Sequence, residues 1–445
     1  MAAKINDLTQ GSIFKGLWTM AIPLIGASFV QMSYNIINML WLGHLGSNNV
    51  AAVGAASFFT LFCNSISMIT KTGAEITVAQ SIGAHDKEKA LSYANQNITL
   101  STWLGLGSVL LLIITASPFI NFFHFEQEIA EKGVNYLHLV APGIFFQFNS
   151  NTYSGIYNGM GDSRTPFKIT SIGLILNLIL DPLLIYGWGI LPALGTNGAA
   201  IATSISQAVV FLIFVKSIFA RKFGLGKVKF ICKIIKQQST KIIKIGLPGS
   251  LQRVLFSVFA LTLATIAAEW GAVGVAVQSI GAQIEAISWL TATGFSTALA
   301  TFVGQNYGAG MFERIRKCYR MTMLTAGSIG LVATFIFYFY STDIFALFVI
   351  EPEAIAEGGR YLKILALSQI FMITEYVATG AFSGFGRTIP PSIVGILFTG
   401  GRIPLAHFLT SFSSLGLSGV WWSITISSIF KGTVLPIWYH YFKKR

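Results

Sequence analysis

The sequence predicts an all-α integral membrane protein with twelve transmembrane helices in two pseudo-symmetric six-helix lobes. Hydrophobic residues make up 53% of the chain and charged residues 11%, and the mean hydropathy is +0.66. This composition lies outside the range of soluble globular domains. The apolar residues also form runs long enough to cross a bilayer, which takes roughly 20 helical residues. Finally, the second half of the chain repeats the first, so one six-helix unit is present twice.

The repeat is seen most clearly in glycine, proline and glutamine positions. At an offset of 225 residues the first copy falls on the second at these positions: Pro23 and Pro248, Gln80 and Gln305, Gly83 and Gly308, Gly155 and Gly380, Gly159 and Gly384, Gly161 and Gly386, and Pro166 and Pro391. The register then slips slightly and places Pro182 on Pro404. A duplication in a strongly apolar chain is typical of secondary transporters, whose substrate site lies between the two copies.

Each copy contains six apolar runs, interrupted in places by Gly and Pro, which membrane helices tolerate. The runs occupy residues 17–43, 51–82, 92–119, 134–160, 168–190, 196–219, 245–269, 275–306, 321–341, 361–385, 391–410 and 417–442. We expect an N-terminal lobe over residues 1–220, a basic cytoplasmic linker over 221–244 and a C-terminal lobe over 245–445.

The formal net charge of +13 suggests nucleic acid as a partner, but the placement of the charges excludes it. Lys and Arg residues gather at the termini, in the even-numbered connections and in the linker, whereas the odd-numbered connections are mainly acidic. By the positive-inside rule both termini are cytoplasmic, and the two copies share one orientation. In the linker, Phe230, Ile231, Ile234 and Ile235 alternate with Lys, which fits either an amphipathic helix on the membrane surface or a solvated loop.

Polar residues inside apolar helices are costly and usually face a cavity, so they indicate the functional site. The first copy places them at helical spacing, one set in each of three spans: Gln31, Tyr34, Asn35 and Asn38; Gln147, Asn151, Ser154 and Asn158; and Asn177 and Asp181. Asp181 is the one acid deep in this lobe and precedes Pro182, which loosens the helix locally. A single carboxylate among amides predicts a cation or proton site, while any one amide could instead join helices.

Six segments stand out: YNIINMLWLGHLG (34–46), GMGDSRTP (159–166), GFGRTIPP (384–391), NLILDPLLIYG (177–187), VAQSIGA (78–84) and VGQNYGAG (303–310). Together they resemble the multidrug and toxic compound extrusion (MATE) transporters, most closely the DinF-like bacterial and archaeal branch. The resemblance implies two six-helix lobes around a central cavity and export of organic cations or other amphipathic compounds against Na⁺ or H⁺ entry. It also implies a coupling site in the first lobe at Tyr34, Asn38, Asn151, Asn177 and Asp181, with Pro23 as the kink point of the first helix.

The sequence departs from that branch at Asn38, where an aspartate is common. One titratable group then remains, and both ions stay possible: an amide oxygen can bind Na⁺, a hard cation that prefers oxygen, and Asp181 can carry a proton. No resident cofactor or metal is expected beyond a possible Na⁺ at this site.

The second copy has buried charges of its own, at Glu285, Glu375 and Arg402, and Arg253 begins its first span. Glu285 could attract a cationic substrate or pair with an arginine. As candidates for the substrate cavity we take Gln31, Asn35, Gln147, Gln283, Glu285 and Glu375.

The sequence therefore predicts an ion-coupled exporter working by alternating access in a prokaryotic plasma membrane. We expect a monomer whose partners are a small organic substrate and membrane lipid, with no nucleic acid. The alternative is a flippase for a lipid-linked precursor, which the shortage of cavity cations disfavours. An enzyme is disfavoured because neither HExxH nor GxSxG occurs, and a channel because two unlike copies cannot form a ring of like groups. The sequence names neither the substrate nor the coupling ion.

Overall fold

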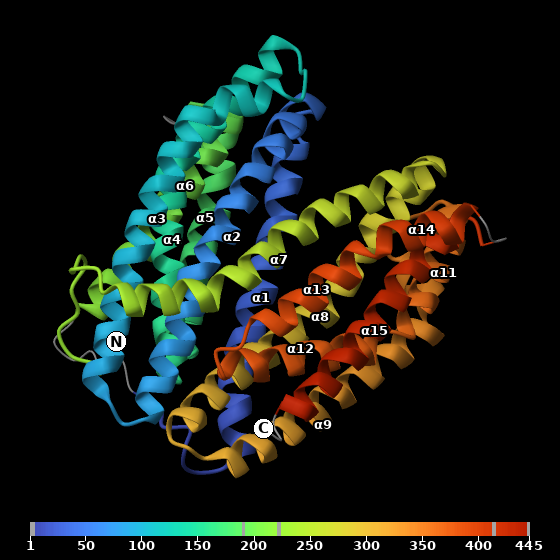
Figure 1. Ribbon diagram of the computed structural model, residues 1–445. Helices are drawn as coiled ribbons and strands as arrows, with labels where there is room; N and C mark the ends of the chain where they lie inside the picture. Colours follow the sequence, from blue (N-terminus) through green and yellow to red (C-terminus); the bar gives the residue numbers. More distant parts are fainter. Residues whose placement is uncertain (1–4, 189–191, 220–223, 412–414, 443–445) are drawn as a thin grey trace. The chain divides into compact units, whose positions relative to one another are not determined.

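The computed structural model describes residues 5–188, 192–219, 224–411 and 415–442, which fold almost entirely into α-helices (Figure 1). The first repeat contains α1 (Ile13–Gly43), α2 (Ser47–Gly83), α3 (Lys87–Asn121), α4 (Gln127–Gly159), α5 (Arg164–Ile185) and α6 (Gly195–Ile218). The second contains α7 (Lys236–Ala268), α8 (Gly271–Gly308), α9 (Phe312–Phe339), α10 (Ser341–Ala346), α11 (Pro352–Ala366), α12 (Gln369–Gly384), α13 (Ile389–Gly400), α14 (Arg402–Ser411) and α15 (Ser418–Phe442).

Each of the twelve predicted spans corresponds to one helix or to a broken pair. In the described part of the chain, nine segments are long and apolar enough to cross a membrane, with α13 and α14 together counting as one. The pair α11 and α12, bent by 49°, makes a tenth. The remaining two, α4 with 33 residues and α15 with 25, are long enough but carry buried Asn, Ser, Thr and Lys side chains that lower their hydropathy.

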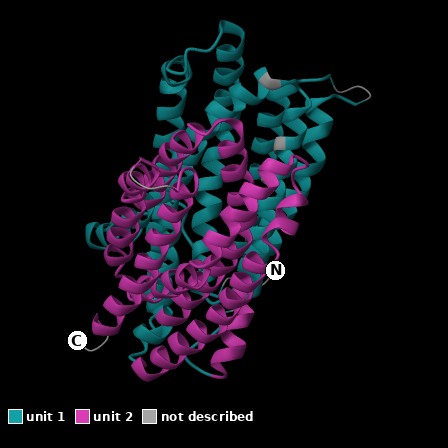
Figure 2. Cartoon of the chain, turned by 90° about the vertical axis from the view of Figure 1, so that its right-hand side faces the viewer, with its two compact units in different colours: residues 1–10, 22–250, 304–310 teal, residues 11–21, 251–303, 311–445 magenta. Residues whose placement is uncertain are grey.

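The helices form two compact units (Figure 2). Unit 1 comprises residues 1–10, 22–250 and 304–310, and unit 2 comprises 11–21, 251–303 and 311–445. In unit 1, α4 packs against α2, α3 and α6 around buried aromatic and aliphatic side chains that include Phe148 and Tyr153. In unit 2, α15 packs against α11, α12, α13 and α14, and Trp421 stacks edge-on against Tyr361 in the core. The predicted lobe limits at 220 and 245 stay a prediction.

The repeat appears in the structure as equivalent helix crossings. A Cβ atom on Gly155 of α4 would collide with the backbone oxygen of Lys71 in α2, and one on Gly380 of α12 would collide with that of Ser296 in α8. These two contacts are related by the same 225-residue offset. One turn further along, the same collision occurs in both copies, between Gly159 and Glu75 and between Gly384 and Ala300. Small residues thus let the helix backbones approach closely at the same place in each copy.

A matched pair of turns follows these crossings. Gly161 ends α4 with φ of 77°, and Gly386 ends α12 with φ of 74°. This left-handed conformation is readily accessible to glycine and costly for other residues. In both copies the glycine therefore closes one span and directs the chain into the next.

Residues 224–235 of the linker are not helical, so an amphipathic helix through Phe230 and Ile235 is wrong. The segment instead lies along α3. The Gln96 side chain donates to the Lys233 carbonyl oxygen at 2.7 Å and accepts from the Ile235 N–H at 3.1 Å. One apolar residue of this segment packs within unit 1, since the Phe230 ring lies against the Phe211 ring of α6. Residues 220–223 lie outside the described part, and 236–244 form the first turns of α7.

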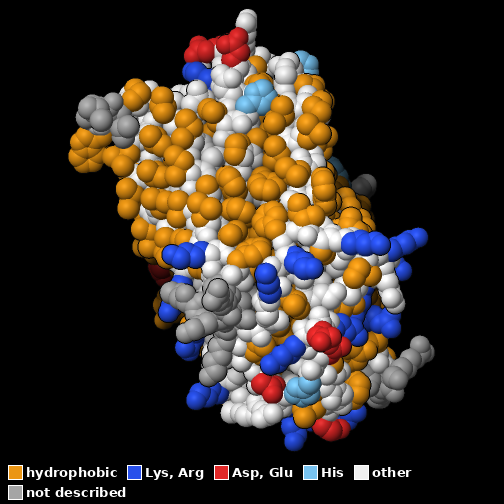
Figure 3. Space-filling view, turned by 90° about the vertical axis from the view of Figure 1, so that its left-hand side faces the viewer, with side chains coloured by type: hydrophobic (Ala, Val, Ile, Leu, Met, Phe, Trp, Pro, Cys, Tyr) orange, Lys and Arg blue, Asp and Glu red, His pale blue; other side chains and the backbone are white. Residues whose placement is uncertain are grey.

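The surface carries many large apolar side chains. On α3 alone, Trp103, Leu106, Leu110 and Ile114 are exposed. Figure 3 shows one face of the molecule covered by a continuous band of hydrophobic side chains, with Lys and Arg gathered towards one end. An exposed patch of this size would be unusual in a soluble monomer and is expected of a lipid-facing surface with one basic aqueous side.

Candidate functional site

Asp181 lies on α5 with its side chain directed into unit 1, and it is 1% exposed. Its carboxylate oxygen Oδ1 accepts a hydrogen bond of 3.0 Å from the amide Nδ2 of Asn177, one helical turn earlier. Among the described residues no Lys, Arg or His nitrogen lies within ion-pair distance of it. A buried carboxylate without a cationic partner is costly when charged, so the group favours binding a proton or a small cation.

Tyr34 and Asn38 of α1 join this site from a second helix. The Asn38 amide Nδ2 donates to the Tyr34 hydroxyl at 3.4 Å, and that hydroxyl lies 3.5 Å from the Thr203 hydroxyl of α6. Tyr34 and Tyr136 of α4 are both close enough to Asp181 to interact with its charge. The Asn38 carbonyl oxygen Oδ1 is buried and has no hydrogen-bond partner in the described residues.

The structure thus brings together four of the five predicted coupling residues, namely Tyr34, Asn38, Asn177 and Asp181. Asn151, the fifth, instead donates from its Nδ2 to the Ser67 hydroxyl of α2 at 2.8 Å. That bond joins α4 to α2. Asn151 therefore has the alternative role expected for a single amide, which is to hold two helices together.

The other predicted positions of the first copy are spread over α1 and α4. Gln147 is half-buried, whereas Gln31 is exposed. The side chain of Asn35 lies outside the described part. Pro23 stands inside α1, which continues through it without a break in the helix.

Two residues at this site, Tyr136 and Thr203, were not found by sequence reasoning. Both are ordinary residue types in membrane helices, and neither shares a helix with Asp181. The sequence holds no signal for them, because only helix packing brings Tyr136 near the carboxylate and Thr203 near the Tyr34 hydroxyl.

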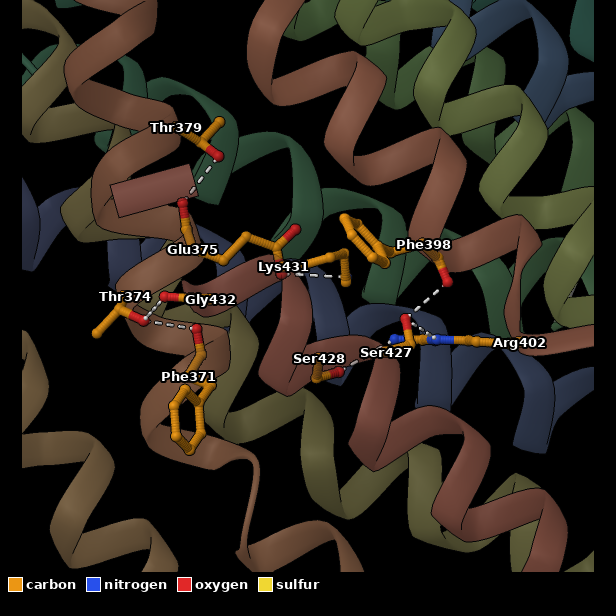
Figure 4. Close-up of polar contacts among 10 residues, drawn as sticks. All are labelled: Phe371, Thr374, Glu375, Thr379, Phe398, Arg402, Ser427, Ser428, Lys431 and Gly432. Carbon is orange, nitrogen blue, oxygen red and sulfur yellow. Dashed lines mark hydrogen bonds and ion pairs between the residues drawn. The ribbon is translucent and has the colours of Figure 1, made fainter. Parts of the chain in front are cut away.

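Unit 2 contains a second polar cluster, built on α12, α14 and α15 (Figure 4). The Lys431 Nζ of α15 lies 3.0 Å from Glu375 Oε2 of α12, and both side chains are 10% exposed. Glu375 is therefore part of a buried ion pair. Lys431 was not predicted from the sequence. A lone lysine inside the apolar run 417–442 could have indicated it, because a charge inside a membrane helix usually has a functional role.

Arg402, at the start of α14, points towards the same face of α15 (Figure 4). Its Nε donates to the Ser427 hydroxyl at 3.1 Å and its Nη2 to the Ser428 hydroxyl at 3.2 Å. Glu285 of α8 is half-buried and interacts with the charge of Arg402. Gln283, two residues earlier, is exposed.

The protein's family follows from a match over both repeats. The MatE family model matches residues 23–183 and again residues 248–408, which together cover more than half of the chain. The chain belongs to the MatE family. The two matched stretches begin at Pro23 and Pro248, so the MatE unit coincides with the repeat seen in the sequence.

Curated relatives resemble this MatE protein over nearly its whole length. It is 28% identical over 435 residues to "Probable multidrug resistance protein NorM" of Thermotoga maritima, covering 95% of this chain and 91% of the relative. It is 25% identical to "Probable multidrug resistance protein YoeA" of Bacillus subtilis, covering 93% and 90%. It is 23% identical to the "FAD transporter" of Shewanella oneidensis, covering 81% and 80%.

Solved structures show the same fold. The MatE chain matches the "Outward-facing conformation of a multidrug resistance MATE family transporter of the MOP superfamily" with a TM-score of 0.90 and 25% identity, covering 100% of this chain and 99% of that one. It matches the "Crystal structure of MATE in the straight conformation" with a TM-score of 0.92 at 24% identity and the same coverage. This MatE protein is therefore a multi-pass membrane protein of a transporter family, not an enzyme.

Proposed function

We propose that the protein exports amphipathic organic compounds, organic cations among them, by alternating access, in exchange for one H⁺ or Na⁺ per cycle bound at Asp181. The names of its relatives, which include multidrug resistance proteins and an FAD transporter, support an amphipathic substrate. Coupling requires that ion and substrate favour different conformations of the protein. We propose that it acts as a monomer with both termini in the cytoplasm.

The observation that carries this proposal is the buried carboxylate of Asp181, which has no Lys, Arg or His partner among the described residues. A carboxylate already paired with Lys or Arg would have little reason to bind a further cation. Asp181 instead has an amide beside it, and the carbonyl oxygen of Asn38 lies in the same cluster. These oxygens suit a hard cation, and the carboxylate alone suits a proton. With one titratable group, the site carries one positive charge per cycle.

The test is gradient-driven export by the Asp181→Asn variant in proteoliposomes with imposed Na⁺ or H⁺ gradients. The amide keeps the size of the side chain but carries no charge, so we expect export to fall to the rate seen without a gradient. Substrate binding at equilibrium should persist. Glu313→Gln, which removes an exposed acid in α9, serves as the control and should transport normally. Export at the normal rate by Asp181→Asn would refute the assignment and make Glu285, which has no direct ion pair among the described residues, the candidate.

Orientation is tested by single cysteines at Lys132 and Arg164. Lys132 lies at the start of α4 and Arg164 at the start of α5, so one span separates them. We expect an impermeant maleimide added outside intact cells to label the first position and not the second. Labelling of both from one side would contradict the twelve-span topology.

The structure gives no support to the flippase alternative. Binding a pyrophosphate needs several free cations in the cavity. Sequence reasoning offered Arg253 and Arg402, and the structure adds Lys431, but Lys431 is already neutralised by Glu375.

A further inference from the structure

The polar cluster of unit 2 contains a guanidinium group, that of Arg402, which makes no ion pair with a carboxylate of the described residues. We propose that Arg402 binds an anionic group, a carboxylate or a phosphate, of the transported compound. Unit 2 would then select anionic or zwitterionic amphipathic substrates over purely cationic ones. This inference rests on the proposed export function for the meaning of the site, but its test does not depend on ion coupling.

The guanidinium group is held in place by neutral groups. Ser427 and Ser428 accept hydrogen bonds from Nε and Nη2 of Arg402, and the Ser427 hydroxyl in turn donates to the Phe398 carbonyl oxygen at 2.8 Å (Figure 4). These contacts use two of the five N–H groups of the guanidinium. The side chain is therefore oriented in advance, while other donors of its planar fork are still available for a ligand.

No carboxylate oxygen lies within 4.0 Å of Arg402 in the part of the chain that the structure describes. The nearest acids that influence it are Glu285 and Glu375. Glu375 is already bound to Lys431 at 3.0 Å, and Glu285 acts from a longer distance. A charge inside a membrane lobe normally has a close counter-ion. Its absence here indicates that the counter-ion arrives with the substrate.

A purely structural role fits this geometry less well. A guanidinium that served only to join helices would be expected to contact a carboxylate with two parallel hydrogen bonds. Nor does the cluster suit a cationic ligand, because Arg402 repels it and the charge of Glu375 is used by Lys431. Lys431 lies one turn beyond Ser427 on α15, so both are on one face of that helix. A negative group at Arg402 would be attracted chiefly by the guanidinium itself, because Glu375 neutralises the charge of Lys431.

The test compares two dyes that differ in one charge. Rhodamine 110 has a free carboxylate, and rhodamine 123 is its methyl ester and purely cationic. Binding of each dye to the purified full-length protein in a neutral detergent is measured by fluorescence anisotropy. We expect wild type to bind rhodamine 110 more tightly. Arg402→Gln should weaken that binding by about 10- to 100-fold, the usual effect of losing a hydrogen bond to a charged group, and change the ester by less than about twofold.

Arg402→Lys is the matched control for Arg402→Gln, since it keeps the positive charge but lacks the planar set of guanidinium donors. It should retain part of the preference for the acid, between wild type and Arg402→Gln. If Arg402→Gln fails to elute as a monodisperse protein, the lysine variant and wild type still decide the question. Equal affinity of wild type for the two dyes, tighter binding of the ester, or no binding of the acid would each overturn the proposal.

Two further arms identify the source of the anion and separate this proposal from the previous one. In nanodiscs, loss of the dye preference with anionic lipid and its retention with neutral lipid would identify a lipid headgroup as the occupant. Retention with both lipids would identify the solute. Asp181→Asn should keep the preference between the dyes even where it abolishes gradient-driven export, so failure of one proposal does not imply failure of the other.

Discussion

The buried pair of Glu375 and Lys431 predicts a large coupling energy between two residues on different helices. The two charged atoms lie 3.0 Å apart, and each side chain is 10% exposed. At an effective dielectric constant of about 20, Coulomb's law gives an attraction of about 5 kcal/mol at that distance. Removing one partner leaves the other charge buried and uncompensated, which typically costs about 3–5 kcal/mol. Removing both leaves no such charge.

We therefore expect Glu375→Gln and Lys431→Met each to lower the free energy of unfolding by about 3 kcal/mol or more. The double variant should lose much less than the sum of the two. The coupling energy from this cycle should be about 2–3 kcal/mol. It is measured by equilibrium unfolding of the purified protein in mixed micelles with increasing SDS, followed by tryptophan fluorescence.

The control cycle uses Glu313 and Arg316 on α9. Their charged atoms are closer, at 2.7 Å, but the side chains are 76% and 48% exposed. Solvent screening and side-chain entropy reduce such a pair to about 0.5 kcal/mol. If burial rather than distance determines the coupling energy, the buried pair of Glu375 and Lys431 has the larger coupling although its atoms are farther apart. Additive effects at Glu375 and Lys431, or equal couplings in the two cycles, would refute this reasoning.

Two further predictions concern unit 1. Gly155→Ala should destabilise the protein by several kcal/mol in the same unfolding assay, because the added Cβ would collide with the Lys71 carbonyl oxygen. Gly107→Ala, at a position with open space, is the control and should have little effect. Equal effects of the two substitutions would contradict the close helix crossing. Asn38→Asp should add a second pH-dependent step to export, since a second carboxylate supplies a second proton site. Two steps in the unmodified protein, both surviving Asp181→Asn, would show that Asn38 has been misinterpreted.

The sequence predicted the spans and the repeat because both depend on local properties. Length and apolar character decide whether a segment crosses the membrane, and they are read directly from the chain. Asp181 and Asn177 were predicted together for a similar reason. They are one helical turn apart on α5, and the spacing alone places them on one face.

The parts that could not be predicted depend on contacts between distant segments. Tyr136 comes near Asp181, and Thr203 near Tyr34, only through the packing of different helices. The pairing of Lys431 with Glu375 likewise joins α15 to α12. The linker shows the same limit. The apolar alternation around Phe230 fits an amphipathic helix, but the Gln96 side chain binds the linker backbone in a non-helical form.

The two repeats keep the same backbone contacts but differ in charge. Gly155 and Gly380 both allow a close helix crossing, and a Cβ atom at either would collide with backbone. Exposed acids such as Glu128 and Glu353 also recur at this offset, but the buried acids Asp181 and Glu375 have no acidic counterpart. Asp181 precedes Pro182, and the residue that precedes the equivalent Pro404 is Ile403. The position in the first repeat that corresponds to Glu375 is occupied by Ser150.

Packing therefore explains why the glycines recur, but it cannot explain the charges. The fold forms in each repeat without the other's acids, and a buried charge costs free energy wherever it lies. Such groups are expected to persist only where they bind something. The unequal distribution calls for a separate ligand in each repeat, which a coupling ion at Asp181 and an anionic substrate group at Arg402 would supply.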